Sequence, residues 1–467
     1  MRRVISPRGA IFLLILGCSP GSTLQGGVSG SGGSAGSSGT GGAAGGAGRP
    51  TGSGGSGTGG TAGSGACVGL RCQQMACSGG QRTRVSGTVF SPKGDLALPN
   101  VAVYVPNAPL GAISDGASCD RCETTLSGDP IVQATTDTNG RFVLDNVPVG
   151  PGIPLVMQVG RWRRQVTLPA VTACTDNPVT DVALTRLPRN QAEGNIPRIG
   201  LTTGGADALE CLIRKIGVDD AEITPPGGTG RVHLFVGEGG TDKMAPTVQG
   251  GAAFANATSL WDTTDGLRRY DVVVLSCEGT ENPTNKSAAA RMAMKQYLDL
   301  GGRVFASHWH NYWVEHGPAP LPTVATFNHQ GDPANPFTVS IDTSFPKGRT
   351  LSEWLLANGA STTAGQLVVH EGQHTIDAVN PAIATRWIYS TMPASVQYLS
   401  FNAPVGVPAD QQCGRLVLTD IHVSSGDESK PATPFPTGCT TMGLTPQEKA
   451  LIFMLFDLSA CLQPDIG

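Results

Sequence analysis

The stretch that most constrains the fold of this chain is residues 267–316, which predicts a strand, a helix and a second strand. Val272–Leu275 is a short apolar run of mostly β-branched residues, typical of a strand buried on both faces. Ala288–Leu300 is moderately amphipathic and ends at two glycines, which predicts a helix. Val304–Ala306 predicts the second strand. Such a unit is parallel, and parallel sheets carry their sites at the carboxyl ends of their strands.

Side chains that can act in catalysis or bind a metal follow these two strands. Others follow a later apolar run, Arg415–Thr419. The candidates at these strand ends are Cys277, Glu278, Ser307, His308, His310, Asp420 and His422. One chemistry that fits them is nucleophilic catalysis. Cys277 beside His308 would form the dyad, with Glu278 close by, because a thiolate needs a basic neighbour.

A zinc site is the second chemistry that fits the same side chains. His308 and His310 alternate, so on an extended segment both imidazoles face one side. His422 or Asp420 would complete three ligands. Glu278 would then act as a base.

The amino terminus predicts export. Residues 1–18 contain three arginines, an apolar run too short to span a bilayer and a final Gly-Cys, the arrangement of a secretory signal. Ile15-Leu16-Gly17-Cys18 also resembles the bacterial lipobox. This resemblance implies cleavage before Cys18, a lipid on its thiol and attachment to a membrane; Ser19 is compatible with the outer membrane. Residues 19–66 are almost wholly Gly, Ser, Thr and Ala, which predicts a disordered tether.

The chain has 12 cysteines, and eleven remain after Cys18. An exported chain oxidises most of its thiols, but eleven is odd, so at least one lacks an intrachain partner. Spacing does not determine the pairs. Cys413, Cys439 and Cys461 lie close enough in sequence for two of them to pair.

Two other cysteine segments leave alternatives open. For Cys277, a disulfide, for example to Cys211, is the alternative to a reactive thiol. Cys119-Asp-Arg-Cys122 has the spacing of a zinc or redox pair, but the chain has no second CxxC segment. A structural disulfide role is therefore favoured for Cys119 and Cys122 in an oxidising compartment.

Residues 67–83 are cysteine-rich, and residues 84–190 predict an all-β domain of short alternating strands. Asn139-Gly140 between apolar runs is the strongest short hairpin signal. The region contains Ser86-Gly-Thr-Val, Leu98-Pro-Asn-Val-Ala-Val, Thr136-Asp-Thr-Asn-Gly-Arg-Phe and Asn146-Val-Pro-Val-Gly. At these residues it resembles the carboxypeptidase regulatory-like (transthyretin-like) domain, which implies a β-sandwich serving as an accessory module.

Residues 191–467 predict an α/β domain with a mainly parallel sheet and insertions. Tyr270–Leu275, Gly301–His308 and Cys413–His422 resemble the class I glutamine amidotransferase-like superfold, most closely its trehalose-utilisation (ThuA-like) branch. In working amidotransferases a cysteine stands at the elbow where this chain has Ser307-His308. The resemblance therefore implies the fold rather than amidotransferase activity.

His370-Glu-Gly-Gln-His374 has the letters of the zinc-protease motif HExxH. That mechanism needs a helix, so that both imidazoles lie one turn apart on one face. Here an apolar strand-like run leads in, and Gly372 lies inside the motif. The sequence predicts a coincidental strand or loop.

The whole chain is thus expected to be multidomain, with an all-β sandwich followed by an α/β domain. Lys and Arg number 32 and Asp and Glu number 36, a formal net charge of −4 that gives no basis for binding nucleic acid. The leading hypothesis is a lipid-anchored envelope protein that binds a glycan or small molecule without catalysis. The alternative is a hydrolase of sugars or amides that uses Cys277, His308, His310 and His422, with zinc as the candidate cofactor.

Overall fold

The computed structural model describes residues 67–121, 126–423 and 426–462. The predicted signal peptide, the lipidation site Cys18, the tether and Cys122 lie outside these residues. Within the described ranges, no helix combines the length and apolarity needed to cross a membrane.

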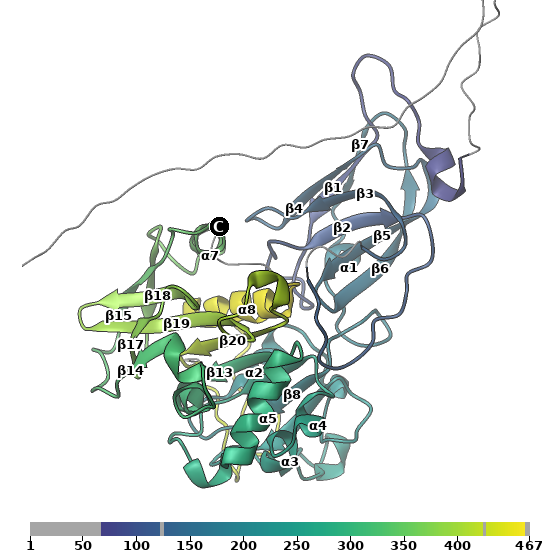
Figure 1. Ribbon diagram of the computed structural model, residues 1–467. Helices are drawn as coiled ribbons and strands as arrows, with labels where there is room; N and C mark the ends of the chain where they lie inside the picture. The colour runs from purple at the N-terminus through teal and green to yellow at the C-terminus, as the bar shows by residue number, and fades with distance from the viewer. Residues whose placement is uncertain (1–66, 122–125, 424–425, 463–467) are drawn as a thin grey trace, which may run out of the picture. The chain divides into compact units, whose positions relative to one another are not determined.

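The first part of the described chain contains two small sheets, which can be followed in Figure 1. One has the order β4-β1-β7 and the other β3-β2-β5-β6. Side chains of both sheets, among them Val85 and Val103, join one buried apolar cluster. The strands are β1 (Arg84–Thr88), β2 (Ala102–Pro106), β3 (Pro130–Thr135), β4 (Arg141–Asp145), β5 (Gly150–Val159), β6 (Trp162–Val171) and β7 (Asp176–Val179).

The turn predicted at Asn139-Gly140 is present, but the strands on its two sides are not paired. Gly140 has a φ of +72°, and the Asp137 carboxylate accepts hydrogen bonds from the backbone N–H groups of Asn139 and Arg141. β3 pairs with β2, whereas β4 pairs with β1 in the other sheet. The hairpin prediction is therefore wrong, because the turn carries the chain from one sheet to the other.

The second part is built on a larger sheet with mixed strand directions; among the described residues it has eleven strands. From β11 to β20 neighbouring strands are parallel, and from β20 to β16 they are antiparallel. The parallel strands are β8 (Ile199–Thr202), β9 (Ile223–Thr224), β10 (Val232–Val236), β11 (Ala255–Asn256), β12 (Val272–Leu275), β13 (Arg303–Ser307) and β20 (Gly414–Thr419). The antiparallel strands are β15 (Phe337–Ile341), β16 (Gln366–Val369), β18 (Thr385–Thr391) and β19 (Ala394–Ala403); β14 (Ala325–Phe327) pairs separately with β17 (Ile376–Val379).

Helices cover both faces of the parallel strands. Every residue of β12, β13 and β20 is buried. Val272 and Val274 belong to the apolar cluster that contains α8 (Pro446–Ser459), while Val273 and Leu275 belong to the cluster that contains α5 (Ala288–Asp299). This alternation explains why the middle residues of these strands are apolar, since both of their faces lie under a helix.

The predicted helix signals are present with small shifts at the ends. Thr445 caps α8 in the capping box expected with Glu448. The first helix of this part, α2, spans Leu209–Lys215, and the helix expected at Thr350–Asn358 is α7 (Pro346–Ala357). Several sheets with mixed strand directions agree with a multidomain, sheet-rich chain.

Four disulfides join pairs of cysteines that both lie in the described residues: Cys67–Cys72, Cys77–Cys174, Cys119–Cys413 and Cys211–Cys439. Two predictions about pairing are wrong. Cys277 is a free thiol, because Cys211 on α2 reaches Cys439 instead. Cys413 and Cys439 each pair with a distant cysteine, and Cys461 is also disulfide-bonded. Cys119 has the structural disulfide role that was favoured over zinc.

Candidate functional site

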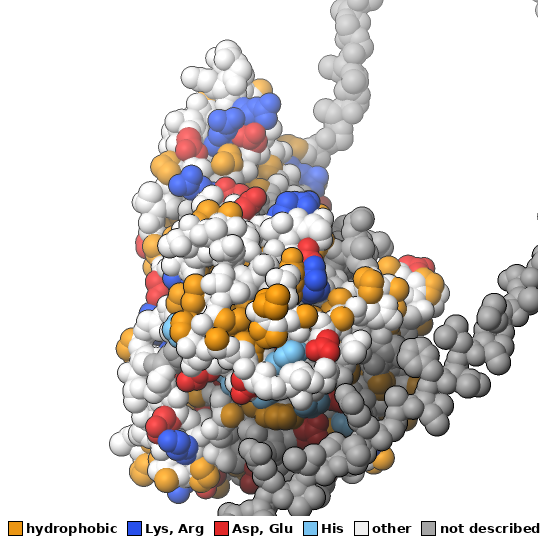
Figure 2. All heavy atoms as spheres, turned by 90° about the vertical axis from the view of Figure 1, so that its left-hand side faces the viewer, with side chains coloured by type: hydrophobic (Ala, Val, Ile, Leu, Met, Phe, Trp, Pro, Cys, Tyr) orange, Lys and Arg blue, Asp and Glu red, His pale blue; other side chains and the backbone are white. Residues whose placement is uncertain are grey.

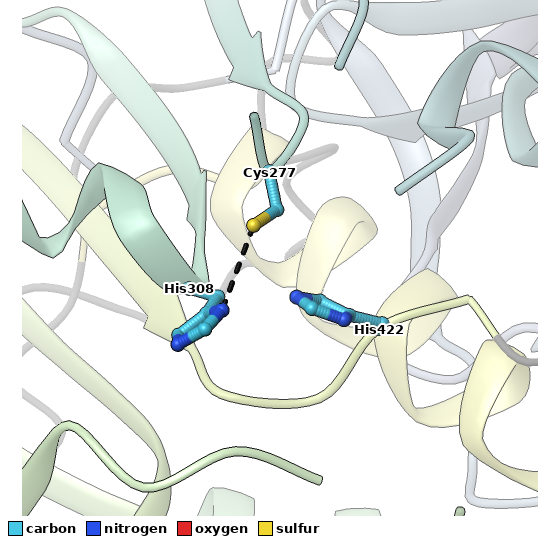
Figure 3. A group of neighbouring side chains, drawn as sticks. All are labelled: Cys277, His308 and His422. Atoms are coloured by element: carbon cyan, nitrogen blue, oxygen red, sulfur yellow. Dashed lines mark hydrogen bonds between the residues drawn. The ribbon is translucent and has the colours of Figure 1, made fainter. Parts of the chain in front are cut away.

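Three strand ends bring a thiol and two imidazoles together, as Figure 3 shows. Cys277 follows β12, His308 follows β13 and His422 follows β20. One ligand atom from each lies within 4.8 Å of the others, and Cys277 Sγ is 3.5 Å from His308 Nδ1. All three side chains are buried. We call these residues the inner cluster.

His308 sits at a sharp elbow. Its φ of +37° lies in the left-handed region, which costs a residue with a side chain about 1–3 kcal/mol. The chain then enters a 3₁₀-helix, His308–Asn311, rather than continuing as a strand. The premise that His308 and His310 face one side of an extended segment is therefore wrong, because neighbours two apart on a 3₁₀-helix point in different directions.

His310 lies outside the inner cluster, with both ring nitrogens occupied. Trp313 Nε1 donates to His310 Nδ1 at 3.0 Å, so His310 Nε2 carries the proton and donates to the Ser276 carbonyl at 2.9 Å. Burial lowers the pKa of His310 to about 4. This neutral imidazole joins β12 to β13, and the prediction of His310 as a metal ligand is corrected accordingly.

Glu278 is held in a buried ion pair instead of facing the thiol. Lys286 Nζ donates to Glu278 Oε2 at 2.6 Å, and the Glu238 backbone N–H donates to Oε1 at 3.1 Å. Burial acts to raise the pKa of Glu278, but His310 and Lys286 outweigh it and hold the pKa below its ordinary value. A carboxylate with these partners is poorly suited to the base role predicted for it.

Asp420 is likewise occupied by structural hydrogen bonds. The backbone N–H and the hydroxyl of Thr375 both donate to its carboxylate at 2.8 Å. Burial raises its pKa to about 6. Of the two alternatives for the third ligand, the structure brings His422 rather than Asp420 to Cys277 and His308.

Cys277 and His308 are both uncharged at pH 7 when nothing is bound. Burial raises the pKa of Cys277 to about 12, although the backbone N–H groups of Trp309 and Gly279 donate to its sulfur. Burial, with the neighbouring His422, lowers the pKa of His308 to about 2. A thiol beside a neutral imidazole is a weak nucleophile, since the thiolate is the reactive form.

Asp207 was missed by the sequence analysis. It is buried after β8; its Oδ2 accepts from Ser307 Oγ at 2.7 Å and its Oδ1 accepts from the Val423 backbone N–H at 3.0 Å. Ser307 precedes His308 and Val423 follows His422, so Asp207 ties together the backbones that carry both histidines. The available sequence signal was that Asp207 follows the carboxyl end of a parallel strand, β8. The turn between Thr202 and Asp207 made that signal easy to miss.

The HExxH letters do not form a helix. The residues follow β16 as a loop in which Glu371 has a φ of +54°. His370 is exposed, whereas His374 Nε2 is 2.8 Å from Asp377 Oδ1. The predicted coincidental match is confirmed.

No protein-family model and no curated protein matches this chain. Among solved structures, a putative ThuA-like protein from Bacteroides uniformis matches with 12% identity over 56% of this chain and 90% of that one, at a TM-score of 0.25. A cohesin–X-dockerin complex from Acetivibrio cellulolyticus matches with 17% identity over 32% of this chain and 78% of that one, at a TM-score of 0.16. Both TM-scores are below 0.5, so the site is argued from its own geometry.

Proposed function

We propose that the inner cluster binds zinc through Cys277, His308 and His422 and leaves a fourth position open for water or a substrate atom. Tetrahedral zinc with sulfur and nitrogen ligands spaces its ligand atoms about 3.3–3.8 Å apart. The 3.5 Å between Cys277 Sγ and His308 Nδ1 agrees with that spacing. One thiolate and two imidazoles are also a ligand set that zinc accepts.

The observation that carries this proposal is the buried Nε2 of His422, which has no hydrogen-bond partner among the described residues. A buried polar atom without a partner costs about 1–3 kcal/mol. Within the described residues, Cys277 and His308 also lack partners of the kind that occupy Glu278, an ion pair with Lys286, and Asp420, hydrogen bonds from Thr375. A bound cation would satisfy all three side chains at once and deprotonate Cys277.

The function that follows is metal-dependent hydrolysis of a sugar or amide substrate. Zinc in a three-ligand site acts as a Lewis acid and lowers the pKa of a coordinated water. The chain's own residues hold the geometry: Asp207 links the segments carrying both histidines, and two backbone N–H groups face the sulfur of Cys277. Nucleophilic attack by a free Cys277 is less favoured because its thiol is neutral.

Metal binding is tested on the purified, metal-free full chain by titration with Co²⁺, a spectroscopic substitute for zinc. We expect one equivalent to give a thiolate-to-metal charge-transfer absorption, and Zn²⁺ to displace it. Cys277→Ser and His422→Gln should remove the absorption, while the exposed His370→Gln serves as the matched control. A wild-type chain without this absorption would overturn the proposal.

The hydrolase assignment is tested separately with chromogenic glycosides and anilides. Zinc-loaded wild type should turn over a member of the panel, and His422→Gln should lose at least a hundredfold in rate. Zinc binding without turnover of any member would argue for a structural metal site instead.

A second candidate, a non-catalytic glycan or small-molecule binder, is favoured by a groove of about 550 Å³ along β17, β18, the start of β19 and the segment before α7. That volume is in the range of small-molecule sites. Arg386 pairs with Asp342 at 2.8 Å and lies over the Tyr389 ring at 3.5 Å, so charged and aromatic groups both line the groove. Saccharide-dependent thermal shifts that Tyr389→Ala removes, with the inner cluster intact, would support this candidate.

The wider setting is proposed from the sequence resemblances. We place the chain in the cell envelope, anchored by lipid on Cys18 at the outer membrane, with a carboxypeptidase regulatory-like sandwich before an amidotransferase-like α/β domain. Two small sheets followed by a sheet with a parallel half support that division. Palmitate labelling of wild type and Cys18→Ala tests the anchor, and loss of label in the variant is the expected result.

A further inference from the structure

A second group of ligand-type side chains gathers outside the inner cluster. Glu281 lies beyond β12, Glu315 ends α6 (Tyr312–Glu315), His316 follows it, and His329 lies beyond β14. We call these four residues the outer cluster. His329 Nε2 is 2.8 Å from Glu315 Oε2, and Glu281 Oε1 is 3.9 Å from the Nε2 atoms of both His316 and His329. Figure 2 shows histidine side chains next to acidic ones at the molecular surface.

The spacing in the outer cluster leaves room for an ion. Distances of 3.9 Å between Glu281 and each imidazole are too long for hydrogen bonds. Two ligands of one first-row divalent metal lie about 3.0–3.6 Å apart, so shifts of a few tenths of an ångström would bring these atoms into one coordination sphere. Ligand atoms of Glu281, Glu315 and His316 already lie within 4.8 Å of one another.

The neighbouring Asn311 supplies an independent observation. Its side chain is fully buried, and its Nδ2 donates to Glu315 Oε2 at 3.2 Å and lies 3.5 Å from His329 Nε2. Its Oδ1 has no hydrogen-bond partner. An amide turned over by a rotation about χ2 would present this oxygen to the cluster, which is favourable only if a cation lies between it and Glu315.

Trp309 holds the outer cluster in place beside the inner one. Its indole stacks on the His329 ring, with centroids 5.2 Å apart and planes 23° apart, and it also contacts the His308 ring at 4.6 Å. One imidazole of each cluster is therefore packed against the same indole. This packing limits the rotation of His329 and reduces the entropy lost when a ligand binds.

We propose that Glu281, Glu315, His316 and His329 bind a second divalent cation, of the kind that accepts carboxylate and imidazole ligands without sulfur. Mn²⁺ is the appropriate probe, because carboxylate oxygens suit it and the thiolate of the inner cluster does not. This site does not depend on the proposed zinc site. A chain that binds both ions would hold two metals of different chemistry, each with an imidazole ligand packed against the Trp309 indole.

The test is a Mn²⁺ titration of the metal-free full chain, followed by the electron paramagnetic resonance signal of free Mn²⁺. We expect one bound equivalent. The double variant Glu281→Gln with Glu315→Gln should weaken binding at least tenfold, and Cys277→Ser should leave it unchanged. Asp299→Asn is the matched control, because it removes a carboxylate of similar exposure from another ion pair, Lys295–Asp299, at the end of α5.

Each result of this titration is decisive. Mn²⁺ binding that the double variant removes and Cys277→Ser does not establishes the outer site, whether or not the inner cluster binds zinc. No bound Mn²⁺, or binding equally strong in the double variant, overturns the proposal. Because the four residues are only partly buried, thermal melting of the double variant should match wild type, and this excludes unfolding as the cause of lost binding.

Discussion

Polar groups are buried at both ends of the central parallel strands, but the two ends differ in how many of these groups have hydrogen-bond partners. At the amino end, Asp271 accepts hydrogen bonds from Arg161 at 2.5 Å, from the Gly116 N–H at 2.7 Å and from the Arg198 N–H at 2.6 Å. At the carboxyl end, Ser276 Oγ and His422 Nε2 have no hydrogen-bond partner in the part of the chain that the structure describes. The Asp271 carboxylate at the amino end is thus fully paired, whereas the carboxyl end has capacity to bind something else.

The same difference distinguishes groups that hold the fold together from groups that are available to bind a ligand. Arg161 comes from the turn between β5 and β6 and Asp271 from the start of β12, so their pair joins the two parts of the described chain. Nearby, the Cys119–Cys413 disulfide makes a second such connection. A buried network with every group paired fixes one arrangement, and buried atoms without partners indicate a ligand site.

Among the variants that test this difference between the two ends, Arg161→Met is expected to change the unfolding free energy most. Removing the closer partner of this buried carboxylate leaves Asp271 with Arg231 at 3.9 Å as its cationic neighbour, and breaking such a pair costs about 3–5 kcal/mol of unfolding free energy. Chemical denaturation measures the loss. The double variant with Asp271→Asn should recover a large part of it.

Metal binding should not change in Arg161→Met under conditions where the variant is folded, because the pair lies at the opposite end of the strands. If Arg161→Met is folded but loses the Co²⁺ absorption, the two ends of the strands are not independent and the distinction between them is wrong.

Glu210→Gln on α2 is expected to raise the unfolding free energy, by less than Arg161→Met lowers it. Burial raises the pKa of Glu210 from 4.5 to about 7, with Asp207 and Asp427 adding to the effect. The folded state therefore holds a proton that the unfolded state releases, so the unfolding free energy falls as pH rises from 4.5 to 7. By contrast, the equally buried Glu448 is paired with Lys215 at 2.7 Å.

Glu210→Gln removes that titration and should be more stable than wild type by about 2–3 kcal/mol at pH 8, with the difference vanishing near pH 4. Denaturant unfolding at several pH values measures the slope. A pH-independent difference between the two proteins would mean that Glu210 does not titrate in this range.

The parts of this picture that could be predicted from the sequence are those set by local pattern. Apolar β-branched runs gave the parallel strands, and the capping box gave the start of α8. Because parallel sheets carry their sites at the carboxyl ends of their strands, the sequence predicted Cys277, His308 and His422 as site residues. The structure places their ligand atoms within 4.8 Å of one another. These features depend on neighbours within a few residues or on a general property of parallel sheets.

What could not be predicted depends on contacts between distant residues. The elbow at His308 turns the chain into a 3₁₀-helix, and this sends His310 to Trp313 and Ser276 instead of toward Cys277. The Cys211–Cys439 pair spans 228 residues, a separation that sequence spacing does not determine. Lys286 follows Glu278 by eight residues, but their ion pair depends on the loop between them folding back.

The smallest and most discriminating comparison is between two serines that each precede an inner-cluster residue. Ser276 precedes Cys277 and its buried hydroxyl has no partner, whereas Ser307 precedes His308 and donates to Asp207. Ser276→Ala should change the unfolding free energy by less than about 0.5 kcal/mol, because no hydrogen bond is lost. Ser307→Ala should cost about 1–2 kcal/mol, because it leaves the buried Asp207 Oδ2 without that donor.

The same pair of variants tests whether Asp207 positions the two histidines. Ser307→Ala releases one of the two backbone segments that Asp207 joins, so Co²⁺ affinity should fall severalfold while Ser276→Ala stays at the wild-type value. Ser307→Thr keeps the hydroxyl and should restore affinity. If both alanine variants bind Co²⁺ equally, the link through Asp207 serves stability alone, and the order at the carboxyl end comes from the elbow at His308.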